Sequence, residues 1–77
     1  MNKARRAKLN RLLETLADAE QDLSAILEED QNAFDNLPES LQLSEKGEDM
    51  QTGVDTLTEC VDQLEELAQT LEEVAAW

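Results

Sequence analysis

A single proline, Pro38, divides this chain of 77 residues into two halves, and each half carries an unbroken helical pattern of apolar residues. Proline disfavours helical geometry at the residue before it, so a helix ending near Asn36 is expected. Ser44 is a good N-cap for a second helix, and the acidic residues after it suit a helix N-terminus. The sequence therefore predicts a helix over 3–36, a hinge over 37–43 and a helix over 44–76, all within one domain.

The apolar residues of both halves recur every 3.5 to 3.6 residues, which is typical of helices and not of strands. Written as heptads, the a positions of the first half are Leu9, Leu16 and Leu23, and those of the second half are Met50, Leu57, Leu64 and Leu71. The leucines at 9, 16 and 23 stand as far before Ser40 as those at 71, 64 and 57 stand after it. The pattern predicts an all-α, coiled-coil-like antiparallel hairpin folded near Ser40.

The distribution of charge favours the same hairpin. The first eleven residues hold five of the six bases, and the last thirteen residues hold four glutamates. The dipole of each helix disfavours the cluster at its own end. An antiparallel arrangement places the two clusters side by side, where they offset each other.

The apolar stripe is wider than the seam of an isolated helix pair requires. A second strip lies at the e positions, where Glu20 is its polar member. A hairpin of 77 residues is also too small to close a core around one seam. We expect a second copy to cover the strip in a dimeric four-helix bundle, and the alternative is a groove that receives a helix of another protein. The self-association residues predicted on this basis are Leu13, Leu27, Phe34, Val54, Val61 and Ala68.

Composition excludes most enzymatic chemistry. The chain has no histidine and one cysteine, so it lacks the usual bases and ligands of nucleophilic triads, zinc sites and haem sites. The acidic stretch that begins at Asp30 has neither the glycine nor the final glutamate of a calcium loop. No apolar run is long enough for a membrane span, and no signal peptide is recognisable. We expect a cytoplasmic, non-enzymatic protein without a catalytic residue, metal or cofactor.

Two surfaces are candidates for contact with a protein partner. The outer face of the second helix is a continuous acidic stripe, which can bind a basic groove as a nucleic acid backbone does. The alternative interpretation of this stripe is a solvated face that keeps the protein in solution. The hinge is the second candidate. The predicted contact residues on these two surfaces are Leu37, Leu41, Glu48, Asp55, Glu59, Asp62 and Glu66.

A different function class is binding of a nucleotide or another anion at the open end of the hairpin. Lys3, Arg5 and Arg6 supply positive charge there, and Trp77 supplies a ring that can stack on a base. Salt bridging of these bases to the C-terminal glutamates is the simpler interpretation. The net charge of −13 also repels nucleic acid, so we do not expect nucleic acid to be the partner. A purely structural oligomerisation element is the third alternative.

The hinge has the least generic sequence in the chain. Residues 34–42 read Phe-Asp-Asn-Leu-Pro-Glu-Ser-Leu-Gln, and they are followed by Ser-Glu-Lys-Gly-Glu at 44–48 and by Met50. With the Asn-Lys-Ala-Arg-Arg opening at 2–6, this resembles short acidic helical proteins encoded by bacteriophages and mobile elements. The resemblance implies a phage accessory protein that acts on a host protein inside a bacterial cell. It implies no catalytic or ligand-binding residue.

Overall fold

Three helices make up the computed structural model, which describes all residues from 1 to 77. They are α1 (Lys3–Asp35), α2 (Glu39–Gln42) and α3 (Glu45–Ala75). The chain is all-helical, and its two long helices pack against each other. The long helices were expected over 3–36 and 44–76, and the single-turn helix α2 lies inside the expected hinge of 37–43.

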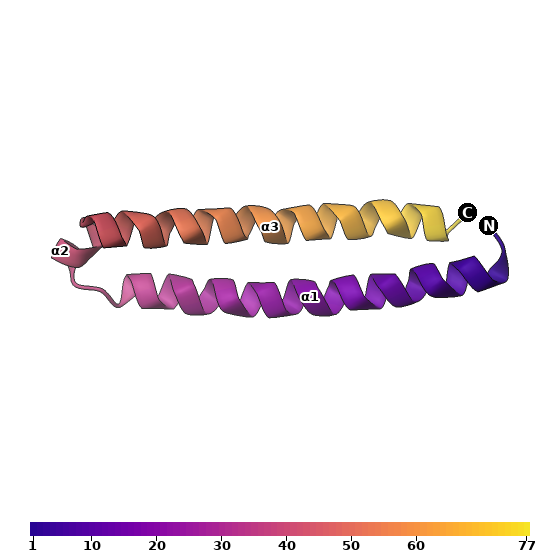
Figure 1. Ribbon diagram of the computed structural model, residues 1–77, viewed down its shortest axis with the longest axis horizontal. Helices are drawn as coiled ribbons and strands as arrows, with labels where there is room; N and C mark the ends of the chain where they lie inside the picture. Colours follow the sequence, from indigo (N-terminus) through magenta and orange to yellow (C-terminus); the bar gives the residue numbers. More distant parts are fainter.

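Helices α1 and α3 run antiparallel along their whole length, and both chain termini lie at the end opposite α2 (Figure 1). The Cα atoms span 58 × 15 × 12 Å, and their radius of gyration is 17.4 Å. A compact domain of this length has a radius of gyration of about 11.5 Å. The molecule is therefore a thin rod, with the open end at its termini and the hinge end at α2.

The contact between α1 and α3 follows the a and e rows of both helices. In the e rows, Val54 is buried, and the residues at positions 13, 20, 27, 34, 61 and 68 are half-buried. All six a-row leucines and Met50 are half-buried as well. The e row, which was expected to face a second copy, is thus already largely covered within the hairpin.

The d rows are the apolar rows that the hairpin leaves open. On α1 they hold Leu12, Ala19 and Ile26, which are all exposed, and on α3 they hold the exposed Leu67 together with the half-buried Cys60 and Val74. Leu12 is 57% exposed, Ile26 49% and Leu67 47%. The apolar strip of each helix consists of the d, a and e rows, with a in the middle. A contact between two helices covers only two adjacent rows, so the third row stays outside it.

Almost none of the chain is fully buried. Val54, with 4% of its surface exposed, is the only fully buried hydrophobic residue, and Gly47 is the only other buried residue. The accessible surface is 5810 Å², whereas a compact monomer of 8.6 kDa exposes about 4,700 Å². The single hairpin therefore leaves roughly 1,100 Å² more surface in water than a globular protein of its mass.

Both long helices begin at a side-chain cap. Asn2 accepts a hydrogen bond from the backbone N–H of Arg5 at 2.8 Å, and Ser44 accepts one from the backbone N–H of Gly47 at 3.3 Å. Each cap satisfies one of the backbone donors that have no partner inside the helix. Two acidic residues, Glu45 and Glu48, lie in the first turn of α3, where the helix dipole stabilises them.

Candidate functional site

The hinge reverses the chain with ordinary backbone geometry, since no residue has a positive φ. Helix α1 ends at Asp35 with Asn36 as its C-cap, and the backbone N–H of Leu37 still bonds to the carbonyl of Phe34 at 3.0 Å. Pro38, with φ −55° and ψ 149°, is the N-cap of α2. The Nε2 of Gln42 donates back to the Phe34 carbonyl at 3.1 Å. The side chain of α2 thus caps the last turn of α1 and fixes the angle of the hinge.

Gly47 allows α3 to begin directly against α2. A Cβ atom at this position would overlap the backbone carbonyl oxygens of Leu41 and Gln42. Gly53, six residues later, has open space where its Cβ would lie. Close backbone approach therefore requires glycine at 47, and helix propensity alone would favour another residue at both positions.

The hinge presents apolar side chains to solvent. Leu37 is half-buried, and Leu41 is exposed. Leu43, which is not among the predicted contact residues, is 75% exposed. A hydrophobic residue directly before an N-cap often packs on the residue at the fourth helical position, which here is Glu48. The absence of an apolar residue at 48 is the sequence signal that could have identified Leu43 as exposed.

The acidic stripe of α3 lies on the side of the helix that faces away from α1. Its members are all exposed, and they are Glu48, Asp55, Glu59, Asp62, Glu66 and Glu73. They occupy the c and f rows and follow the helix for roughly 37 Å. Asp55 accepts a hydrogen bond from Nε2 of Gln51 at 3.0 Å. We call these six residues the acidic face.

The open end brings together the basic cluster and Trp77. Lys3, Arg5 and the indole of Trp77 are exposed, and the two chain termini lie at the same end of the rod (Figure 1). Arg6 is half-buried in the e row, and its Nε atom is buried without a hydrogen-bond partner. This end therefore contains an unsatisfied donor, which the hinge end does not.

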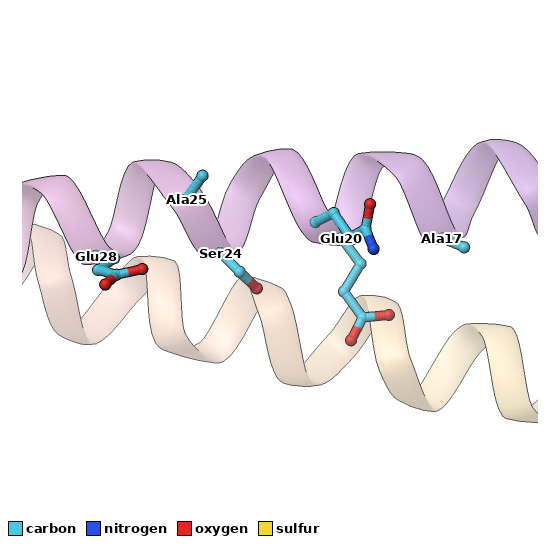
Figure 2. Close-up of a pocket in the computed structure, with 6 residues that line it drawn as sticks. Ala17, Glu20, Ser24, Ala25 and Glu28 are labelled. Atoms are coloured by element: carbon cyan, nitrogen blue, oxygen red, sulfur yellow. The ribbon is translucent and has the colours of Figure 1, made fainter.

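One depression is present on the surface, along the side of α1. It is shallow and open, and it is lined by Ala17, Glu20, Gln21, Ser24, Ala25 and Glu28. Figure 2 shows the carboxylate of Glu20 extending from α1 toward the other helix, while Ala25 points away from it. The lining groups are carboxylates, an amide, a hydroxyl and methyl groups, and none of them is a nucleophile activated by a neighbouring base.

The remaining chemical groups are separate from one another. No group of three or more His, Cys, Asp and Glu side chains is arranged to hold a metal ion. Cys60 is a free thiol, half-buried at the middle of α3. Neither long helix has a stretch that is apolar enough, over sufficient length, to cross a membrane.

Comparisons with protein families, with curated proteins and with solved structures found no match to this chain.

Proposed function

We propose that this protein is a non-enzymatic interaction module that assembles as a dimeric four-helix bundle and binds a basic surface of another protein. The observation that carries this proposal is the acidic face of α3, whose six carboxylates are all exposed along one straight helix. A row of fixed negative charges attracts a basic groove over a long distance and speeds association with it.

Self-association buries apolar surface that the single hairpin leaves exposed. Only one hydrophobic side chain is fully buried, and the large apolar residues of the d rows are in water. A helix pair with so little buried apolar area is marginal, and packing of a second pair is the usual solution for short helical chains. A dimer of this kind presents two copies of the acidic face.

The kind of partner follows from charge. Six acidic residues on one face, in a chain of net charge −13, repel nucleic acid and favour a protein with clustered lysines and arginines. The resemblance of the hinge and the N-terminal opening to phage-encoded acidic helical proteins suggests that this partner is a bacterial host protein.

The test compares two sets of charge-neutralising substitutions that change net charge equally. One set converts the six residues of the acidic face to Gln or Asn. The control set does the same on α1, at Glu14, Asp18, Asp22, Glu28, Asp30 and Asp35, all of which are exposed. Each tagged protein is used to capture partners from a bacterial lysate at low and at high salt, with identification by mass spectrometry.

We expect the same basic protein to be captured by the wild type and by the control, to be lost with the acidic-face variant, and to be released at high salt. Equal capture by all three proteins would contradict a role for the acidic face. Equal loss with both variants would indicate that net charge alone holds the partner.

A further inference from the structure

The two d rows lie on the same side of the hairpin. Viewed down the helix axis, the d row of each helix lies roughly 80° from the centre of the contact between α1 and α3, on the opposite side of the a row from the e row. Because α1 and α3 are antiparallel, their successive residues turn in opposite senses when both helices are viewed from one end of the rod. The same angular offset from the contact therefore places both d rows on the same side of the hairpin. This side, which we call the open face, is formed by Leu12, Ala19, Ile26, Gly53, Cys60 and Leu67.

The open face is the least charged side of a strongly acidic molecule. On α3 the d and g rows from Gly53 to Val74 contain no charged residue, and the g-row members are Thr56, Gln63 and Thr70. Apart from Asp49, which lies in the g row near the hinge, the carboxylates of this helix lie on its other sides, including the acidic face. Two copies of a chain with net charge −13 can therefore approach through this face with little repulsion.

We infer that two copies of the chain pack through the open face, with the hinge end of one copy lying over the open end of the other. The inference rests on the proposed dimer and specifies its interface. In this arrangement a two-fold axis crosses the middle of the rod, so α1 packs on α1 of the other copy and α3 on α3, each pair antiparallel.

The sizes of the side chains fit this symmetry. Ala19 is the central residue of α1 and Cys60 is the central residue of α3, so each lies opposite its own counterpart at the axis. Small residues there allow close approach of the helices. Seven residues away, Leu12 of one copy faces Ile26 of the other, and Leu67 faces Gly53, where there is open space.

Charge selects this orientation over the parallel one. With the hinge end over the open end, Lys8 lies beside Glu29 of the other copy, at the rim of the interface. In a parallel dimer, α1 packs on α3 of the other copy, and Glu29 lies beside Asp49 instead. The first arrangement gains two opposite-charge pairs, and the second places two like-charge pairs at the same rim.

The area agrees with a second copy as the occupant. The hairpin exposes roughly 1,100 Å² more surface than a compact monomer of its mass, and a standard interface buries about 800 Å² on each partner. One contact along the broad side of the rod, which measures 58 by 15 Å between Cα atoms, supplies an interface of that size.

Cysteine cross-linking with the oxidant diamide tests this arrangement. In the reaction two thiols give up two hydrogen atoms to diamide, which becomes the hydrazine, and their sulfurs form one disulfide. The wild type carries its thiol at Cys60, and a variant with Ala19→Cys and Cys60→Ser carries it on α1. Both proteins are oxidised separately and as a mixture, and their covalent dimers are identified by mass.

We expect covalent homodimers from each protein alone, and no covalent heterodimer from the mixture. The parallel dimer would give the reverse, with heterodimers only, because Ala19 would then lie opposite Cys60 of the other copy. A third variant, with Gln69→Cys and Cys60→Ser, places the thiol on the outer side of α3 and should not cross-link. Cross-linking of this variant as efficiently as the wild type would overturn the inference.

A second measurement uses the apolar residues. Leu67→Glu introduces two charges into the proposed interface, and we expect it to raise the dimer dissociation constant by about 100-fold or more, with helicity unchanged. Leu43→Glu, at an equally apolar and more exposed position outside the open face, should change that constant by less than about twofold. A wild-type dimer that tolerates Leu67→Glu would refute this interface alone. A wild type that never dimerises would refute the proposed dimer as well.

Discussion

The hinge end and the open end of the rod are built from similar helices but are specified in different ways. At the hinge end, side chains and backbone groups meet at fixed positions, and both fully buried residues, Gly47 and Val54, belong to α3 near this end. At the open end the same a and e rows continue, but every residue is half-buried or exposed. The hinge thus fixes the geometry of the hairpin, and the remaining contact is repetitive.

This difference teaches that heptad patterning alone leaves the fold of a short hairpin loosely determined. Repeated leucines pack nearly as well after a shift of one heptad. The backbone contacts between α2 and the start of α3 tolerate no such shift. We expect substitutions at the hinge end to cost more stability than equivalent ones elsewhere in the rod, when unfolding is compared at one fixed protein concentration.

The largest effect is expected for Gly47→Ala. Its methyl group would overlap two backbone carbonyls of α2, so α2 must move, and we expect a loss of about 2 to 3 kcal/mol in unfolding free energy. The matched control is Gly53→Ala, which meets open space and should stabilise the helix by about 0.5 to 1 kcal/mol. Urea unfolding followed by circular dichroism measures both. Two variants with the same sign of change would contradict the role assigned to Gly47.

Val54→Ala should have the next largest effect. The side chain is 4% exposed, and its truncation should cost about 2 kcal/mol, from lost burial and the cavity left behind. Val61 occupies the same e row one heptad further along and is half-buried, so Val61→Ala should cost about half as much. Thermal and urea unfolding measure both variants. Equal losses of unfolding free energy for Val54→Ala and Val61→Ala would show that the two positions are packed equally well, against this expectation.

The two N-caps provide a smaller version of the same comparison. Ser44→Ala removes a cap at the hinge and should cost about 1 kcal/mol. Asn2→Ala removes the cap of α1 at the open end, where the first turn can fray without disturbing the rest, and should cost about half of that. Amide hydrogen exchange of the first turn of each helix distinguishes a local effect from a global one. A global loss with Asn2→Ala would contradict this account of the open end.

The smallest effect, and a stabilising one, is expected at Arg6. Its Nε is buried without a partner, so Arg6→Leu removes an unsatisfied donor and continues the apolar e row. We expect a gain of about 0.5 kcal/mol. Lys3→Leu, at an exposed position of the same end outside the d and e rows, serves as the control and should give no gain. A lower midpoint for Arg6→Leu than for Lys3→Leu in urea unfolding would contradict the expectation.

Much of the fold could be predicted because its signals are local. Pro38 and Ser44 mark the ends of the long helices, and the symmetric placement of leucines about Ser40 favours an antiparallel pair. The spacing of apolar residues could not predict whether the d row or the e row joins the a row in the contact, because the two rows flank the a row at similar angles around the helix. The uniformly apolar e row of α3 was the available clue, against a d row interrupted by Lys46 and Gly53.

The roles of Gly47 and Gln42 could not be predicted from the sequence. From the sequence, a glycine in the first turn only lowers the helix propensity. The reason that position 47 requires glycine is the close approach of the α2 backbone, which only the structure shows. The hydrogen bond from Gln42 to Phe34 likewise depends on the angle of the reversal. The exposed acidic face was predicted, because a row of carboxylates opposite an apolar stripe has to face water.

The central claim is that the hairpin completes its core with a second copy, and the mass in solution measured by light scattering tests this claim most directly. The mass of one chain is 8.6 kDa, and we predict about twice that value at micromolar concentration, with the dimer strengthened by salt that screens the shared negative charge. A mass of one chain at every concentration and salt, with full helicity retained, would contradict the claim.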